Sequence, residues 1–324
     1  MLAWLFPGQG AQTVGMGRGL YETSRRAREV FDRADAALGW KLSNLCFEGP
    51  ESELMLTANT QPAILTTSIA TLEALREEYP ELPEPTFVAG HSLGEYSALV
   101  AAGALSLEDA VRLVNLRGKA MQEAVPAGIG AMAAVMGATH EQILEICRKA
   151  AEDEIVSPAN FNAPGQIVIA GHAGAVERAK AAAAEAGQKV IPLKVSAPFH
   201  CALMAPAAAA LNEAFKTIKL SPPRVPVVAN VNAKPNRDVN QIPQLLFRQV
   251  DGTVMWEQSV RYMAEFGVDR ALEIGPGTVL AGLVKRIDKR ISTLSVNSRD
   301  AFAKLPSFLA HRRETVTALS ASPA

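Results

Sequence analysis

The sequence predicts an α/β fold in which a large domain with a parallel sheet carries a small inserted domain. Three observations lead to this prediction. Short apolar runs alternate with longer helical patterns in both outer parts of the chain, the middle has a different order of elements, and proline-containing segments border that middle. With 324 residues, of which 48% are hydrophobic, the chain can bury a sizeable core.

The elements of the large domain are predicted from apolar runs and helical periodicity. Residues 2–6 and 86–89 are short apolar runs that predict buried strands, each followed by a glycine-containing turn. Residues 59–79 have a helical pattern that tolerates Pro62 because this residue falls in the first turn. The remaining predicted elements are helices at 92–102, 107–125 and 278–287, and strands at 225–231 and 271–274. This alternation is typical of a parallel sheet covered by helices.

The middle of the chain has the order of a ferredoxin-like module. Thr139 and Gln142 form a capping-box pattern at the start of a predicted helix. The elements are, in order, strand 130–137, helix 139–151, strands 155–159 and 166–170 around the turn FNAPG, helix 175–186 and strand 190–195. This is the split βαβ arrangement. We therefore expect a large domain at 1–126 and 198–305, a small domain at 127–197, and a flexible polar tail at 306–324.

The composition excludes several classes of function. The formal net charge is −1, so no overall field attracts nucleic acid or an anionic membrane. The cysteines, Cys46, Cys147 and Cys201, are too scattered to predict a disulfide framework or a zinc site. The apolar run at 2–6 is too short for a signal peptide, and no run is long enough to span a membrane. We expect a cytoplasmic protein without a metal site.

Ser92 stands in the motif GHSLG, between a predicted strand and a predicted helix. Gly90-x-Ser92-x-Gly94 in this context matches the nucleophile elbow, a sharp turn that leaves room only for small flanking residues. The helix behind the turn directs backbone N–H groups toward an acyl oxygen on which negative charge develops, and the Leu93 N–H is the natural first donor. Ser92 is the predicted nucleophile, and the neighbouring His91 is interpreted as a packed, hydrogen-bonded side chain.

A serine hydroxyl needs a neighbouring base. His200 is the predicted base because it follows the last small-domain strand, where the chain re-enters the large domain and a cleft is favoured. His140 and His172 begin small-domain helices and are interpreted as solvated surface residues, and His311 lies in the tail. The acid available between serine and histidine, Glu185, falls in a small-domain helix. A dyad in which a main-chain carbonyl orients His200 therefore fits better than a triad.

Arg117 lies in the apolar stripe of the predicted helix 107–125. Its neighbours at helical spacing are Leu113, Val114, Ala120 and Met121, so its side chain is expected to point inward. A buried guanidinium needs a partner, and none of these neighbours is acidic. The partner is either a carboxylate from elsewhere in the fold or a carboxylate on a ligand. The nearby serine site favours the ligand, because the planar fork of arginine suits a carboxylate.

Seven motifs together resemble one family. They are FPGQGAQTVGMG at 6–17, GHSLGEY at 90–96, LVNLRGKAMQ around Arg117, NFNAPGQIVIAG at 160–171, FHCALM at 199–204, RQVDGTVMW at 248–256 and EIGPGTVLAGLVKRI at 273–287. With these motifs the chain resembles the malonyl-CoA:acyl carrier protein transacylases, the acyltransferases of fatty acid and polyketide synthesis. The resemblance runs nearly from end to end. It implies an α/β-hydrolase-like large domain with a ferredoxin-like insert.

The resemblance also implies a role for each main site residue. Ser92 would be acylated by malonyl-CoA, His200 would act as the base, and Arg117 would bind the malonyl carboxylate. The malonyl group would then pass to the phosphopantetheine thiol of acyl carrier protein. The substrates would be malonyl-CoA and the phosphopantetheinyl carrier protein. Neither a cofactor nor a metal would be needed.

Further residues receive supporting roles from the same resemblance. Gln9 and the Leu93 N–H would line the oxyanion hole. Gln249 would hold His200 through its main-chain carbonyl, which accounts for the missing acid. Asn160 and Asn162 would lie in the cleft.

One position departs from the common family pattern. Many stand-alone bacterial members have S-V-P-S-H before the motif histidine, whereas this chain has S-A-P-F-H with Phe199. A phenylalanine here is common in malonyl-selective polyketide acyltransferases, in which its bulk crowds an α-methyl group. The resemblance therefore implies a preference for malonyl over methylmalonyl and leaves the pathway, fatty acid or polyketide, open.

The expected partners are malonyl-CoA and an acyl carrier protein, and the protein is expected to be a monomer. Carrier proteins are usually acidic, so a basic rim is expected around the site. The candidate clusters are Lys285, Arg286, Lys289 and Arg290, and Arg25, Arg26 and Arg28. Two alternatives remain: an editing thioester hydrolase that uses the same serine and histidine but needs no buried arginine, and a non-catalytic scaffold that docks the carrier.

Overall fold

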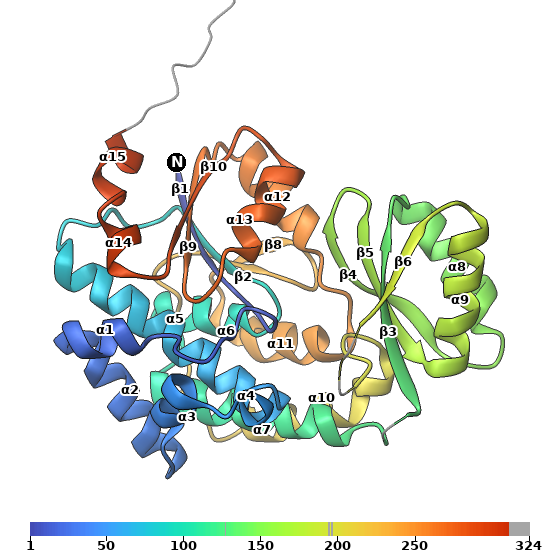
Figure 1. Ribbon diagram of the computed structural model, residues 1–324, viewed down its shortest axis with the longest axis horizontal. Coiled ribbons are helices and arrows are strands. Elements are labelled where there is room, and N and C mark those ends of the chain that lie inside the picture. Colours follow the sequence, from blue (N-terminus) through green and yellow to red (C-terminus); the bar gives the residue numbers. More distant parts are fainter. Residues whose placement is uncertain (127, 194, 196, 311–324) are drawn as a thin grey trace, which may run out of the picture.

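The computed structural model describes residues 1–126, 128–193, 195 and 197–310. Two sheets lie side by side, a large one built from both outer parts of the chain and a small one built from the middle (Figure 1). The predicted α/β class and the ferredoxin-like order of the middle are confirmed. The domain boundaries that we expect from the sequence remain predictions.

The large sheet has six strands in the order β10-β9-β1-β2-β7-β8. These strands are β1 Leu2–Phe6, β2 Phe87–Gly90, β7 Val227–Ala229, β8 Lys234–Asn236, β9 Arg270–Ile274 and β10 Ser292–Val296. The first five in this order run parallel, whereas β8 pairs antiparallel with β7. The sheet is thus mixed at one edge. β8 and β10 were not predicted, because β8 is three residues long and β10 shows no alternation of buried and exposed residues.

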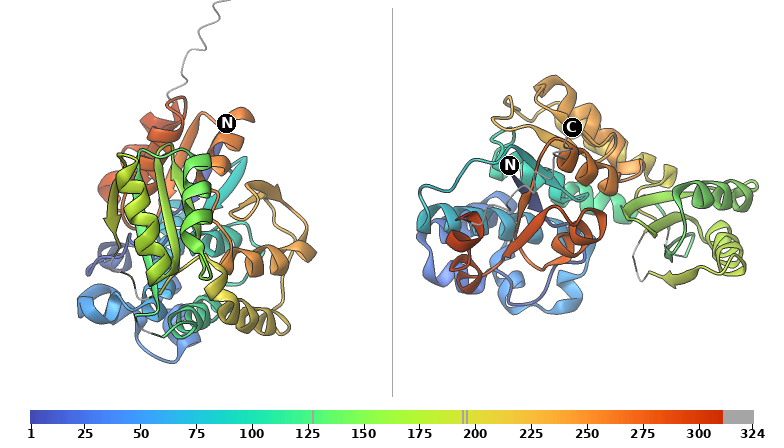
Figure 2. Two further views of the ribbon diagram at one scale, coloured as in Figure 1. Left: turned by 90° about the vertical axis from the view of Figure 1, so that its right-hand side faces the viewer. Right: turned by 90° about the horizontal axis from the view of Figure 1, so that it is seen from above.

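Helices cover both faces of the large sheet (Figures 1 and 2). Side chains of β1 alternate between the two faces: Ala3 and Leu5 pack with α12 and α13, and Trp4 packs with the cluster that contains α5. The helices are α1 Arg18–Thr23, α2 Arg25–Leu38, α3 Leu42–Glu48, α4 Glu51–Leu54, α5 Thr57–Glu78, α6 Gly94–Ala101, α7 Leu107–Glu123, α10 Ala205–Phe215, α11 Ile242–Asp251, α12 Trp256–Glu265, α13 Val279–Ile287, α14 Arg299–Phe302 and α15 Leu305–Ala310.

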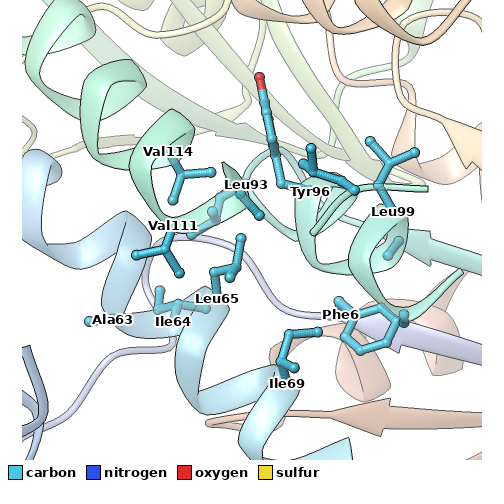
Figure 3. Close-up of a cluster of buried hydrophobic side chains, with 14 of the residues drawn as sticks. Phe6, Ala63, Ile64, Leu65, Ile69, Leu93, Tyr96, Leu99, Val111 and Val114 are labelled. Carbon is cyan, nitrogen blue, oxygen red and sulfur yellow. The ribbon is translucent and has the colours of Figure 1, made fainter. Parts of the chain in front are cut away.

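Helix α5 lies in the centre of the larger core. Figure 3 shows Leu65 of α5, Tyr96 of α6 and Val111 of α7 in one cluster of buried side chains. Because α5 is buried on nearly all sides, its apolar pattern has no clear polar face. This packing fixes α6, which begins two residues after the predicted nucleophile, against α7, which carries the predicted carboxylate-binding arginine.

The small sheet has four antiparallel strands in the order β4-β5-β3-β6. Helices α8 and α9 cover one of its faces (Figure 2). The predicted capping box is present, since Thr139 Oγ1 accepts from Gln142 N while Gln142 Oε1 accepts from Thr139 N. The elements are β3 Gly130–Met136, α8 His140–Ala151, β4 Val156–Ala163, β5 Gln166–His172, α9 Ala173–Glu185 and β6 Lys189–Pro192.

Strand β4 joins the small sheet to the large domain. Phe161 N donates to Val254 O at 3.0 Å, and Val254 N donates to Ala159 O at 2.9 Å. Thr253 Oγ1 donates to Pro158 O at 2.7 Å. These contacts hold the middle of β4 beside the segment that follows α11. The cleft between the two parts is thereby bordered by β4 on one side and by the carboxyl ends of β1 and β2 on the other.

The C-terminal segment is ordered further than its polar composition predicts. Residues Leu305–Ala310 form α15, in which Leu305 is buried and Phe308 and Leu309 pack against the larger core cluster. The expectation of a flexible tail from residue 306 is therefore wrong for 306–310, because two apolar side chains find a core to cover. The rest of the predicted tail, including His311, lies outside the described residues. Among the helices of the described chain, none has the length and apolarity to cross a membrane.

Replacement of Gly90 by alanine is expected to destabilise the fold by about 1–3 kcal/mol or more. A Cβ at Gly90 would lie 2.0 Å from the carbonyl carbon and oxygen of Gly94, which are backbone atoms that cannot move freely. Urea unfolding of G90A measures this loss. G282A is the matched control: a Cβ at Gly282 meets nothing within 4 Å inside α13, so this change should be neutral or slightly stabilising. An unchanged unfolding midpoint in G90A would contradict the close approach.

Candidate active site

The turn after β2 holds Ser92 in a strained backbone conformation. Its φ is 51°, a left-handed value that a non-glycine residue adopts at a cost. Asn230, which follows β7, stabilises the turn from two sides: Ser92 N donates to Asn230 Oδ1 at 2.6 Å, and Asn230 Nδ2 donates to Gly90 O at 2.7 Å. A strained serine between a strand end and a helix start is the geometry of a nucleophile elbow.

His200 lies directly against the serine. Ser92 Oγ and His200 Nε2 are 2.7 Å apart, and His200 Nδ1 is 2.8 Å from the main-chain carbonyl oxygen of Gln249. That carbonyl can only accept, so Nδ1 carries the proton and Nε2 presents its lone pair to the serine hydroxyl. Glu185 is exposed at the end of α9, a helix that covers the small sheet. The structure therefore pairs this histidine with a carbonyl, as the dyad prediction requires.

Burial sets the charge state of His200. The side chain is buried, and desolvation together with the positive charge of Arg117 lowers the pKa of His200 to about 3, although the Gln249 carbonyl opposes the shift. The imidazole is therefore neutral near pH 7 and can accept a proton. His200 also has a positive φ of 60°, so its backbone is held in a special conformation like that of the serine.

Arg117 projects from α7 into the same place and is only 1% exposed. Its Nη2 donates to Ser92 Oγ at 3.1 Å and to Gln249 Oε1 at 3.0 Å, and its Nη1 donates to Gln61 Oε1 at 2.8 Å. The guanidinium also lies over the Tyr96 ring, 5.5 Å from the ring centroid. The inward orientation predicted from helical spacing is confirmed.

No carboxylate forms an ion pair with Arg117 in the described part of the chain. Its partners are amide and hydroxyl oxygens, and its buried Nε has no hydrogen-bond partner among the described residues. Burial lowers the pKa of this guanidinium, and the nearby Tyr96 and Glu95 offset part of the effect. A buried cation held only by neutral groups is prepared for an anion from outside.

A cavity of about 150 Å³ opens on these three side chains. It continues into an outer cavity of about 220 Å³ that is bordered by β4, β5 and α13, and both share the residues Gln9, His91, Asn160 and Leu193. The inner cavity suits a short acyl group, and the outer one provides a route for a longer thiol arm. The residues that line the inner cavity are Gln9, Gln61, His91, Ser92, Arg117, Met121, Met132, Asn160, Leu193, Val195, Phe199 and His200.

The two predicted oxyanion donors are the Leu93 N–H and the Gln9 side chain. The Leu93 N–H begins α6 and makes no hydrogen bond within the described chain. Gln9 lines the cavity from the turn after β1, with its Nε2 only weakly engaged by Thr57 Oγ1 at 3.3 Å. This turn packs closely on the elbow, because a Cβ at Gly8 would lie 2.3 Å from His91 O. The turn that carries Gln9 therefore packs against the elbow that carries the Leu93 N–H.

The remaining predicted residues lie around the cavity, in mainly structural contacts. His91 Nε2 is 2.7 Å from Asn162 Oδ1, and burial lowers the pKa of His91 although the Asn162 contact opposes the shift. Asn160 is buried on β4 and forms a bridge with Val254. Phe199 borders the cavity and is 9% exposed. The interpretation of His91 as a packed, hydrogen-bonded side chain agrees with these contacts.

Two other histidines are less exposed than the sequence predicts. His140 lies against the Phe161 ring, with centroids 4.1 Å apart, and its Nε2 is 3.2 Å from Glu257 Oε2. His172 Nδ1 accepts from Ile155 N at 2.9 Å. Both histidines are partly exposed, so the expectation of solvated surface side chains holds only in part. Phe161 of β4 and Glu257 of α12 contact His140, and the segment before β4 contacts His172.

Sequence reasoning missed three side chains that hold the site together: Gln61, Glu95 and Asn230. Gln61 and Asn230 contact the main site residues directly, and Glu95 Oε2 accepts from Gln249 Nε2 at 2.8 Å. Glu95 falls inside the motif GHSLGEY, which was a usable signal. Gln61 and Asn230 carry no local signal, because only the tertiary fold brings them to the serine.

Comparison with known proteins agrees with this geometry. Residues 3–300 match the family described as the acyl transferase domain. The malonyl CoA-acyl carrier protein transacylase of Escherichia coli (strain K12) is 49% identical over 302 residues, which cover 93% of this chain and 97% of that protein.

Two solved structures are similarly close. An acyl carrier protein S-malonyltransferase from Vibrio cholerae has a TM-score of 0.92 at 44% identity, covering 94% of this chain and 99% of that chain. A malonyl-transacylase solved in complex with a type II polyketide acyl-carrier protein has a TM-score of 0.90 at 46% identity, covering 94% and 98%. On these matches and on a site that unites an elbow serine, a histidine and a buried arginine, this chain belongs to the acyl transferase domain family.

Proposed function

We propose that this chain transfers the malonyl group from malonyl-CoA to the phosphopantetheine thiol of an acyl carrier protein, through a malonyl-Ser92 intermediate. One observation supports the choice of acyl group above others: the buried guanidinium of Arg117 donates to Ser92 Oγ and has no carboxylate partner in the described chain. A malonyl group on the serine carries a carboxylate that can contact this cation directly. The names of the relatives point to the same acyl group.

The first half-reaction forms the acyl-enzyme. His200 Nε2 takes the Ser92 hydroxyl proton as Oγ attacks the thioester carbonyl carbon. The carbonyl oxygen becomes an oxyanion between the Leu93 N–H and the Gln9 side chain, a preorganised arrangement in which each donor is worth about 100- to 1,000-fold in rate. The C–S bond then breaks, and the departing CoA thiolate receives the proton from His200.

The second half-reaction reverses these steps with a different thiol. His200 takes the proton of the phosphopantetheine thiol, the sulfur attacks the malonyl ester carbon, and the proton returns to Ser92 Oγ as the ester bond breaks. The free energies of hydrolysis of a thioester and an ester are similar, so exchange of the acyl group between them is nearly balanced. Hydrolysis of either one is favourable, and the enzyme must therefore keep water out. Arg117 contributes by holding the malonyl carboxylate at the inner end of a small cavity. No cofactor or metal is needed for either step.

Phe199 is proposed to favour malonyl over methylmalonyl. Its side chain borders the inner cavity together with Met121 and Met132. An added α-methyl group would have to displace these side chains in a space of about 150 Å³. Because both pathways use malonyl units, this selectivity is compatible with fatty acid synthesis and with polyketide synthesis.

Of the two basic clusters, the one at the end of α13 and just after it is better placed for an acidic carrier. Arg286 Nη1 donates to Gln166 Oε1 at 2.6 Å, and Gln166 lines the outer cavity. Lys285 and Arg286 are exposed. In the other cluster, Arg25 pairs with Glu29 and Arg26 lies near Glu73. Compensation of charge does not separate the two clusters, because Arg290 pairs with Asp288.

Reversal of charge on α13 is expected to weaken carrier use. The double variant K285E/R286E should raise the KM for the carrier about ten-fold, while the rate at which malonyl-CoA loads Ser92 stays unchanged. Steady-state transfer assays and single-turnover loading measure the two steps separately. R25E/R26E is the matched control and should leave both steps at the parent rate. Equal carrier KM values in both double variants would place the docking surface elsewhere.

Transfer and hydrolysis are separated by the fate of the malonyl group. We expect that protein mixed with malonyl-CoA and a holo carrier yields carrier heavier by one malonyl group, with little free malonate. Intact-mass measurement of the carrier and quantification of malonate give both products from one mixture. Malonate as the main product would favour the thioester hydrolase, and absence of malonyl from both protein and carrier would favour the non-catalytic scaffold. We also propose that the protein is a cytoplasmic monomer. Sedimentation analysis tests its oligomeric state.

A further inference from the structure

Glu95 is a buried carboxylate that the transfer mechanism leaves unused. It is the second residue of α6 and is 3% exposed. Its Oε2 accepts from Gln249 Nε2 at 2.8 Å and from Asn230 N at 2.9 Å. A buried carboxylate is costly unless it is hydrogen-bonded and balanced by a positive charge. Its two donors are both neutral, so the balancing charge has to be found further along the network.

The side-chain amide of Gln249 links Glu95 to the arginine. Its Nε2 donates to Glu95 Oε2 and to Ser92 O, while its Oε1 accepts from Arg117 Nη2 at 3.0 Å. No direct ion pair joins Glu95 and Arg117 within the described residues, since this amide lies between them. The contact with Glu95 also fixes which end of the amide faces the guanidinium.

The other charged and titratable groups near Glu95 are few. On α6 itself the neighbour is Tyr96, and across Gln249 lies His200, which is neutral. The strands β1, β2 and β7 and the residues 57–72 of α5 contain no titratable side chain. On α11 and β8, Arg248 and Lys234 are exposed and Asp251 is half-buried. Arg117 is therefore the one buried cation that faces Glu95 among the described residues.

We propose that Glu95 is the resident counter-charge of Arg117, and that binding of a carboxylate-bearing acyl group makes Glu95 take up a proton from solvent. In the empty site one buried cation is matched by one carboxylate. When the malonyl carboxylate binds the guanidinium, two carboxylates share one cation, and both cannot remain ionised without a large cost. Glu95 is the one that can be neutralised, because the acyl carboxylate takes the direct contact with the arginine.

The titration of Glu95 supports this assignment. Burial raises the pKa of Glu95 to about 7, while the contacts with Asn230 and Gln249 and the charge of Arg117 oppose the shift. A second anion near Arg117 raises that pKa further, so the protonated form gains affinity for malonyl. The affinity for malonyl therefore falls as pH rises above the pKa of Glu95 in the empty site, by up to about ten-fold per pH unit.

The inference rests on the proposed malonyl chemistry, and calorimetry tests it separately. S92A blocks acylation and allows binding to be measured with malonyl-CoA near pH 7.5 in two buffers of different ionisation enthalpy. We expect uptake of a substantial fraction of a proton per malonyl-CoA bound, and none with acetyl-CoA, which lacks the carboxylate. In S92A/E95Q the uptake with malonyl-CoA should vanish. S92A/E185Q, with the same change on an exposed residue of α9, should behave like S92A.

The outcomes are distinct from those that test the function. If the parent protein acquires malonyl on Ser92 but S92A binds malonyl-CoA without proton uptake, the role of Glu95 is wrong. Uptake that persists in S92A/E95Q would assign the proton to another group, such as His200, and would also overturn the inference. If S92A/E95Q does not fold, S92A/H200A separates the two groups: uptake with malonyl-CoA that persists without His200 supports Glu95, and uptake that is lost overturns the inference. Failure of the parent to acquire malonyl at all would remove the proposed function and this inference with it.

Discussion

Arg117→Ala is expected to slow malonyl loading of Ser92 by about 100- to 1,000-fold, because it removes the two charge-assisted hydrogen bonds that one guanidinium can give to one carboxylate. Acetyl loading should change by less than about ten-fold, since an acetyl group has nothing for the arginine to bind. The ratio of malonyl to acetyl loading, measured as acyl-enzyme mass in a competition, therefore falls steeply. Because Arg117 is buried, the space that its side chain leaves must be filled by water or by repacking of the neighbouring side chains.

Arg112→Ala is the control for this experiment. Arg112 lies on the same helix but is half exposed and pairs with Asp109, so its loss should leave both loading rates at the parent values. Thermal unfolding of both variants shows whether α7 remains folded. Malonyl loading at the parent rate in Arg117→Ala, with the fold intact, would mean that the carboxylate is bound elsewhere.

His200→Ala is expected to reduce single-turnover acylation of Ser92 by about 100- to 10,000-fold, the usual contribution of a positioned general base. The hydroxyl would then face Arg117, which donates and cannot accept its proton. Binding of malonyl-CoA should change little, because the guanidinium and the oxyanion donors stay in place. His140→Ala, which removes the histidine at the start of α8, should acylate like the parent.

The pH dependence of this step follows from the charge state of His200. A pKa lowered to about 3 means that the neutral, proton-accepting form persists far below the pH at which an ordinary histidine becomes charged. At saturating malonyl-CoA, acylation should therefore stay flat from about pH 8 down to about pH 5. The rate is measured by rapid quench and mass analysis. A loss of rate centred near pH 6.5 would show that His200 titrates like an ordinary histidine, and it would contradict the claim that burial keeps this side chain neutral.

Sequence patterns predicted the residues whose chemistry is tied to local structure. Ser92 was found because an elbow needs a strand, two small residues and a helix in immediate succession. Arg117 was found because a charged residue inside an apolar stripe breaks the helical period. His200 needed one further argument, the position at which the small domain ends.

Tertiary contacts account for what sequence patterns could not predict. Gln61 lies in a helix that is buried on nearly every side, and Asn230 follows a three-residue strand, so neither stands out among its neighbours. Glu95 follows the nucleophile by three residues, yet its meaning depends on Gln249, which is far away in the chain. The edge strand β8 and helix α15 were missed because short elements are stabilised by what they pack against and carry little pattern of their own.

The most direct measurement of the central claim is the mass of the acyl-enzyme formed in competition. Protein mixed briefly with equal amounts of malonyl-CoA, acetyl-CoA and methylmalonyl-CoA, then mapped by peptide mass analysis, shows which acyl group is attached and to which residue. A hydroxyl, an imidazole and a guanidinium that contacts no carboxylate among the described residues line one small cavity, and they predict malonyl on Ser92 as the dominant species. Acylation without preference for malonyl, or on a residue other than Ser92, would contradict that account.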